Sequence, residues 1–166
     1  MNKIIMKKIL INPKRDLIFD LKVKESCKSC KRYSQKATCP PHVDSLEYYE
    51  KLLKTYKYGI IYYEQFKSTK EQWEEIGKKS SLDMHTHLLK TRDELFLEGH
   101  HFVVAFGAGS CKLCKECSFP CRNPSKSLIP MEGTGLNVVE LLRRKKIKIN
   151  FPVTDSIYRI GLILYD

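Results

Sequence analysis

Cys111-Lys-Leu-Cys114-Lys-Glu-Cys117-Ser-Phe-Pro-Cys121 is the stretch around which the rest of the chain is organised. Its four cysteines are separated by two, two and three residues, the spacing with which bacterial-type ferredoxins hold an iron–sulfur cluster. A cluster needs several thiolates that converge on one small object, and a short run that folds around it provides them. The run therefore predicts a metal or cluster site. Ferredoxins place a proline directly after the fourth cysteine, but here Arg122 and Asn123 come first, so the run does not by itself indicate a ferredoxin.

The segment Gly107-Ala-Gly-Ser110 directly precedes the run, and a strand expected over 101–106 leads into it. Small residues allow the backbone to crowd a ligand, so we expect N–H groups of this segment to approach the cluster sulfurs. A loop held by a buried strand is a common way to position functional residues. Lys112, Lys115 and Arg122 lie among the cysteines, and positive charge there is expected to stabilise the reduced, more anionic cluster and raise its potential.

Three further cysteines, Cys27, Cys30 and Cys39, bring the total to seven. An odd number of cysteines in a chain expected to be cytoplasmic does not indicate disulfides, because the cytosol is reducing. In the simplest arrangement the run holds one four-iron cluster and these three cysteines hold a second. In the ferredoxin-like alternative Cys121 crosses to complete their set, and the first three cysteines of the run hold the other cluster. Either way, two cubanes leave one iron without a cysteine, where a substrate, a sulfide or a water can bind.

Zinc is the alternative metal. The stretch Cys39-Pro-Pro-His42 has a C-x2-H spacing, so Cys27, Cys30, Cys39 and His42 can also form a closed zinc site. Another zinc arrangement joins the pair Cys27/Cys30 to a C-x2-C pair of the run, but it leaves three cysteines without a role. The remaining histidines have no ligand-like partners and are expected to pack or to contact solvent: His85, His87, His100 and His101.

The chain has 30 lysines and arginines against 19 aspartates and glutamates, a formal net charge of +11 at pH 7. These charges are dispersed, as on a solvated surface, but a basic balance also suits acidic partners, including nucleic acid. The basic stretch Arg143-Arg-Lys-Lys146 has the sign for nucleic acid, although aromatic residues are not interleaved with it as in single-strand binders. No segment is apolar for long enough to span a bilayer, and Lys7 and Lys8 interrupt the apolar start, so we expect a cytoplasmic protein without membrane contact.

Strand-like and helix-like segments alternate along the chain, which predicts an α/β (or α+β) fold. We expect one domain over 1–166, with a layered sheet, helices and cysteine-rich loops that hold the metal. β-Branched and aromatic residues predict strands at 17–21, 58–66, 101–106 and 158–165. The last of these is too apolar for an edge strand. Capping residues and apolar periodicity predict helices from Asp44 toward Gly59, from Ser68 to about Leu97, and from Asn137 to Lys146.

These motifs together resemble a known family, the small proteins of anaerobic archaea and bacteria that are described as predicted metal-binding proteins with a domain of unknown function. The resemblance rests on Cys27-x2-Cys30, on Thr38-Cys39-Pro-Pro-His42, and on the segment from Gly107 to Pro124. It extends over 127–138, which resembles the family's Pro-Ser-Met-Glu-Ala-x-Gly-Ile-Asp-Val segment, with departures at 128–130 and at Gly133. The resemblance brings no assigned reaction. It implies seven ligand candidates: Cys27, Cys30, Cys39, Cys111, Cys114, Cys117 and Cys121.

Three functions follow from these patterns. The first is an iron–sulfur (4Fe–4S) protein with one or two clusters that serves electron transfer, with a redox partner protein or a small molecule as its partner. The second is a cluster-dependent enzyme that acts on sulfur or a small ligand at the open iron, although no nucleophile with an adjacent base and no phosphate loop accompanies the cysteines. The third is a zinc-stabilised module that binds nucleic acid or protein.

Overall fold

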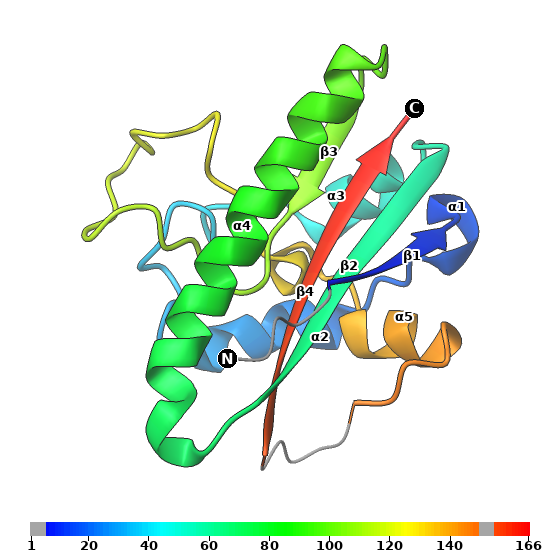
Figure 1. Cartoon of the computed structure of the whole chain (residues 1–166). Helices are drawn as coiled ribbons and strands as arrows, with labels where there is room; N and C mark the ends of the chain where they lie inside the picture. Colours follow the sequence, from blue (N-terminus) through cyan, green and yellow to red (C-terminus); the bar gives the residue numbers. More distant parts are fainter. Residues whose placement is uncertain (1–5, 150–154) are drawn as a thin grey trace.

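The computed structural model describes residues 6–149 and 155–166, and it contains a four-stranded antiparallel sheet in the order β1-β2-β4-β3 (Figure 1). The predicted mixed α/β layered architecture is confirmed. The strands are β1 (Lys7–Ile11), β2 (Tyr58–Lys67), β3 (Val103–Phe106) and β4 (Ser156–Tyr165). The α-helices are α1 (Pro13–Asp16), α2 (Leu21–Ser26), α3 (Leu46–Leu53), α4 (Trp73–Leu97) and α5 (Val138–Arg144). Three 3-10 turns complete the elements: η1 (Cys27–Ser29), η2 (Lys70–Gln72) and η3 (Met131–Thr134).

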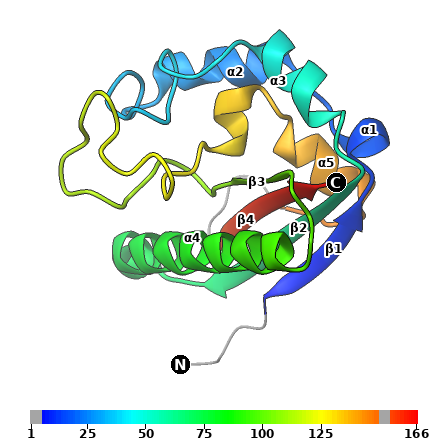
Figure 2. The same cartoon turned by 90° about the horizontal axis from the view of Figure 1, so that it is seen from above.

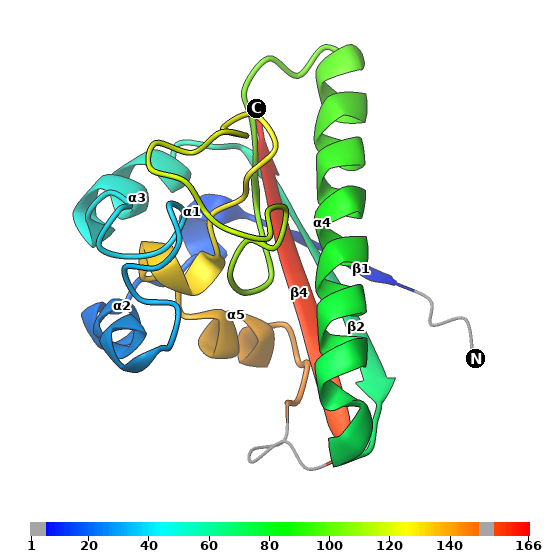
Figure 3. The same ribbon diagram turned by 90° about the vertical axis from the view of Figure 1, so that its left-hand side faces the viewer.

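The sheet separates two cores, and α4 covers one face alone while the other helices lie on the opposite face (Figures 2 and 3). On the α4 face, Met84 and Leu88 pack with Ile60 and Ile163. On the other face a larger cluster joins the sheet to α3 and α5, and it contains among others Ile61, Leu53, Leu141, Leu142 and Leu162. This alternation of buried side chains along β2 and β4 is what a sheet covered on both faces requires.

Strand β4 lies between β2 and β3, so the prediction that it is not an edge strand is confirmed. It pairs with β2 along its full length, from Tyr58↔Tyr165 to Lys67↔Ser156. Strand β3 is shorter and pairs only with 162–165 of β4. The chain leaves β3 at Phe106 and enters the cysteine run five residues later, so the sheet fixes where that loop begins.

Gly161 is where α4 comes closest to the sheet. A Cβ atom added at this position would lie 2.7 Å from Leu88 Cδ1 and 3.0 Å from Met84 Sδ. We expect Gly161→Ala to lower the free energy of unfolding by about 1–3 kcal/mol, because an extra methyl group overpacks a filled core. Urea unfolding measures this loss. The double variant Gly161→Ala/Leu88→Val should lose less than the sum of the single changes, and strict additivity would contradict the described contact.

The N-terminal part of the chain differs most from the sequence-based expectation. The predicted strand over 17–21 is wrong: only Phe19 forms a bridge, to Leu136, and helices flank it on both sides. Asn12 caps α1 by accepting a hydrogen bond from the Arg15 N–H, and Asp20 caps α2, so capping side chains override the local β-propensity. Strand β1 was not predicted. The start of the chain, over 1–5, lies outside the described residues.

The other predicted elements are present with shifted ends. The cap of α3 lies one residue after the expected Asp44, because Ser45 accepts a hydrogen bond from the Tyr48 N–H and the helix begins at Leu46. The expected capping box at Ser68 is instead made by Thr69 and Gln72, and it opens η2 before α4 begins. The cap at Asn137 is confirmed, because its side chain accepts a hydrogen bond from the Glu140 N–H at 3.0 Å.

Candidate metal centre

Two cysteine-rich loops lie side by side on the β3 side of the sheet, and the loop that follows β3 lies next to α4 (Figures 1 and 2). One is the segment between β3 and η3, which carries the four-cysteine run, and the other follows α2 and carries Cys27, Cys30 and Cys39. The loops are joined by a hydrogen bond from the Ala37 N–H to Cys117 Sγ at 3.3 Å. The ring of His42 also packs on Phe119, with 4.6 Å between ring centroids. Cysteines that are far apart in the sequence are therefore brought together.

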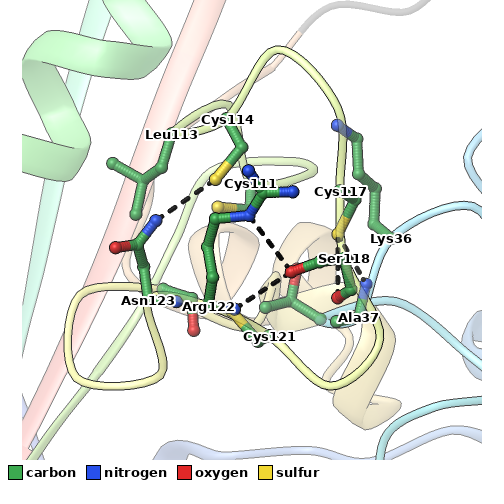
Figure 4. A pocket seen from close by; sticks show the side chains of 12 residues that line it. Lys36, Ala37, Cys111, Leu113, Cys114, Cys117, Ser118, Cys121, Arg122 and Asn123 are labelled. Carbon is green, nitrogen blue, oxygen red and sulfur yellow. Dashed lines mark hydrogen bonds between the residues drawn. The ribbon is translucent and has the colours of Figure 1, made fainter.

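The four cysteines of the run surround one small cavity of about 20 Å³ (Figure 4). Residues 36–38 of the other loop form part of its wall, and Arg122 and Asn123 close it after the run. The cysteines come from a backbone that contains neither helix nor strand, so their positions are set by turns and by contacts with neighbouring loops. All four members of the run, Cys121 included, thus line the same cavity.

Backbone and side-chain N–H groups point at the cysteine sulfurs. Asn123 donates twice, from its backbone N–H to Cys121 Sγ at 3.4 Å and from Nδ2 to Cys114 Sγ at 3.2 Å. The Arg32 N–H donates to Cys30 Sγ at 3.4 Å, in addition to the bond from Ala37 to Cys117. Hydrogen bonds of this kind stabilise thiolates and tune the potential of a metal cluster. They make the run a chemically suitable holder for such a group.

Cys27, Cys30 and Cys39 line a second cavity of about 310 Å³. Gly109 and Ser110 form part of its wall, so this part of the small-residue segment reaches the other cysteine set. The expectation that its N–H groups approach the sulfurs of the run stays a prediction. The prolines beside Cys39 keep the loop free of helix, as expected.

The environment of the three-cysteine cavity disfavours ionised thiols. Burial, together with the nearby Cys30 and Cys27 thiols, raises the pKa of the Cys39 thiol to about 11. Burial also raises the pKa of the Cys27 thiol, and the carboxylate of Glu132, which lines the same cavity, adds to the rise. A metal cation reverses this balance, because it supplies the positive charge that the thiolates lack.

The histidines have structural partners. His42 lies outside the lining of both cysteine cavities, and its Nε2 is 3.1 Å from the carbonyl oxygen of Ser34. Nε2 of His85 is 2.6 Å from the carbonyl oxygen of Lys126, and burial lowers the pKa of this imidazole. His87 packs edge-on against Tyr62, and Nδ1 of His100 is 2.7 Å from the carbonyl oxygen of Asp166.

A comparison with protein families matches residues 10–165 to the family described as predicted metal-binding protein (DUF2284). The chain belongs to this family. The resemblance seen in the sequence is thereby confirmed, and the matched span contains all seven cysteines and both cavities. A search of curated proteins and a search of solved structures gave no match.

In this member of the family, α4 anchors the cysteine run from one face. Ser81 Oγ donates to the carbonyl oxygen of Ala108 at 3.3 Å, and Arg92 Nη1 donates to that of Ser125 at 2.9 Å. His85 lies between them on the helix and contacts Lys126 as described above. Residues four and seven positions apart share a helix face, which is why three side chains of one helix reach the same loop.

Within 6–149 and 155–166, no three His, Cys, Asp or Glu side chains are grouped closely enough to hold a single metal ion. Over the same residues, no helix combines the length and the apolar character that a membrane crossing needs. Sequence reasoning named the seven cysteines but missed Ala37, Asn123 and Glu132 as site residues, although Asn123 stands where the run departs from the ferredoxin pattern.

Proposed function

We propose that this chain is an iron–sulfur protein that transfers electrons, with one four-iron cluster in the four-cysteine cavity and a second in the three-cysteine cavity. The observation that carries the proposal is the division of the seven cysteines between two adjoining cavities, with N–H donors on sulfurs of both sets. Four thiols around one cavity are the ligand set of a four-iron cluster. When bound, such a cluster supplies one-electron redox chemistry. The protein residues bind it, shield it and set its potential.

The two cavities adjoin through two backbone segments. Thr38 lines the four-cysteine cavity while the next residue, Cys39, lines the other. Ser110 and Cys111 are divided between the cavities in the same way. Consecutive Cα atoms are only about 3.8 Å apart, so the two sites share a wall that is one residue thick. Clusters held this close would exchange electrons readily, which suits a carrier with two centres.

Arg122 gives a test of how the protein sets the potential. Its guanidinium lines the four-cysteine cavity and its Nε donates to Ser118 Oγ at 3.2 Å (Figure 4). We expect Arg122→Glu to lower the potential of that cluster by tens of millivolts, because reduction adds negative charge beside a carboxylate instead of a cation. Arg122→Gln should lower it by less. Spectroelectrochemistry measures both values, and equal potentials for all three proteins would contradict this role.

A basic groove beside the four-cysteine cavity supports a negatively charged redox partner. Cys111 and Cys114 reach this groove, and among the described residues that line it Glu74 is the only acidic one. The basic side chains that line it are Arg32, Lys36, Lys78, Lys112 and Lys115.

Opposite charges accelerate the association of two proteins, and salt screens this attraction. We expect the rate of electron transfer from an acidic donor protein to fall as the salt concentration rises. The double variant Lys36→Glu/Lys78→Glu should have a lower rate than the unchanged protein at low salt. A salt-independent rate would exclude docking here.

The proposed function is tested by the metal content of protein purified without oxygen. We expect about eight irons and eight sulfides per chain, and a visible absorption that bleaches when the protein is reduced. Zinc without sulfide would contradict the proposal and would favour a zinc-stabilised module. A cluster that no reductant can reduce would contradict the electron-transfer role while leaving the iron–sulfur assignment intact.

A further inference from the structure

Three cysteines leave one iron of a four-iron cluster without a thiolate, and the three-cysteine cavity offers one other anionic side chain. Among the described residues that line this cavity, Glu132 is the only acidic one. Its carboxylate is close enough to Cys27 to contribute to the rise in that thiol's pKa. Carboxylate oxygens bind iron in many proteins, so this side chain has the chemistry of a fourth ligand.

The backbone around Glu132 is held firmly against the cysteine loop. Glu132 lies in η3, which ends at Gly135 with a φ of +93°, a conformation that glycine adopts without strain. A Cβ atom added at Gly133 would lie 3.4 Å from Pro40 Cδ, so the turn packs directly on the residue after Cys39. Lys24 Nζ donates to the Gly133 carbonyl oxygen at 3.2 Å and joins the turn to α2. The position of Glu132 is therefore set by the same elements that position the cysteines.

Glu132 also lines a second, larger cavity of about 450 Å³. The larger cavity is lined mainly by apolar residues together with Trp73 and Arg159. Within the described residues, Arg159 makes no ion pair, and its guanidinium bonds to the carbonyl oxygens of Gly77 at 2.9 Å and Tyr158 at 3.1 Å. Its Nε and the Trp73 Nε1 have no partner among the described residues.

We propose that the Glu132 carboxylate would be the fourth ligand of a cluster held by Cys27, Cys30 and Cys39, and that a small anion would replace it at this corner of the cluster. This inference rests on the proposed function and deepens it, because it turns one of the two clusters into a binding site. The exchange is a substitution in which the carboxylate leaves the iron and the anion takes its place, so no electron is transferred. A carboxylate binds iron less tightly than a thiolate, which makes this corner of the cluster the exchangeable one.

The test compares the protein with three variants, all loaded with clusters: Glu132→Cys, Glu132→Ala and Glu25→Ala. Glu25 lies on α2 two residues before Cys27 but outside the cavity lining, so its variant is a matched control. Mössbauer spectra should show one iron of about eight with oxygen ligation in the unchanged protein and in the control. Glu132→Cys should convert this iron to the all-sulfur signature. Glu132→Ala should lose about one iron per chain on mild oxidation and give the signal of a three-iron cluster.

Cyanide is the probe for the exchange, and it should perturb the spectrum of this same iron in the unchanged protein but not in Glu132→Cys. An oxygen-ligated iron that survives in Glu132→Cys would overturn the assignment of Glu132 as its ligand. All irons showing sulfur ligation in the unchanged protein would overturn it as well, with the electron-carrier proposal intact. Cyanide that perturbs no iron would overturn the exchange. A chain without iron and sulfide would instead refute the proposed function, so the two failures are distinguishable.

Discussion

Replacing Cys114 and Cys117 together by alanine should remove about half of the iron and sulfide and leave the other cluster in place. The two thiols line the four-cysteine cavity, and a cluster that loses two of its four ligands is not retained. Replacing Cys27 and Cys30 together should remove the other half, because these thiols line only the second cavity. Iron and sulfide analysis with EPR of the reduced protein measures both losses. Ser29→Ala, between Cys27 and Cys30, is the control and should keep full content.

Cys121 decides between the two ways of distributing the cysteines. In two-cluster ferredoxins the fourth cysteine of the run serves the other cluster. Here Cys121 lines the same cavity as the rest of its run, and the Asn123 N–H donates to its sulfur at 3.4 Å. We therefore expect Cys121→Ala to damage the cluster that the Cys114/Cys117 variant loses, with the second cluster unchanged. Loss of the cluster associated with Cys27 and Cys30 would show that the chain uses the ferredoxin arrangement.

The spacing of the cysteines was readable from the sequence because it is a local property of the chain. Four thiols within a short run point to one site whatever fold surrounds them, and the resemblance to the family extended this to the other three. The hydrogen bond from Ala37 to Cys117 joins residues 80 positions apart, and any residue with a free N–H can make it. No residue type marks such a contact in advance. Glu132 was hidden for the same reason, since one glutamate in a turn has many ordinary explanations.

The fold was predictable where apolar content was high and ambiguous where short elements compete. The largely apolar character of β4 indicated a strand covered on both sides, and its position between β2 and β3 agrees. At 17–21 the β-branched and aromatic residues suggested a strand, but Asn12 and Asp20 cap short helices around it. Strand β1 is short, begins with two lysines and lies at the edge of the sheet, so it carries little apolar signal. Tertiary pairing with β2, rather than local preference, makes it a strand.

Removal of the metal should loosen the cysteine loops while the sheet remains folded. Between β3 and η3 the described chain has no helix or strand, and its backbone is fixed mainly by turns, by the anchors on α4 and by the contact with Ala37. The sheet and α4, by contrast, enclose fully buried residues such as Met84, Leu88 and Ile163. Because metal binding and folding of such a site are coupled, each cluster contributes to the order of the loop that holds it.

Limited trypsin digestion distinguishes the two regions, because both loops are rich in lysine and arginine. In the loaded protein we expect cleavage after Lys115, Arg122 and Lys31 to be about a hundredfold slower than in chelator-treated protein. A ligand present at about a hundred times its dissociation constant lowers the population of the open loop by this factor. Sites within α4, such as Lys79 and Lys90, should resist in both forms, because the helix packs on the sheet without help from the metal. Mass spectrometry of the fragments identifies each site. Equal cleavage of the loops with and without metal would mean that turns and the contacts with α4 order them without the clusters. Rapid cleavage inside α4 after chelation would mean that the clusters stabilise the whole fold. The expected pattern, loose loops on an intact sheet, follows from a core that is built from apolar contacts and a site that is built from thiols.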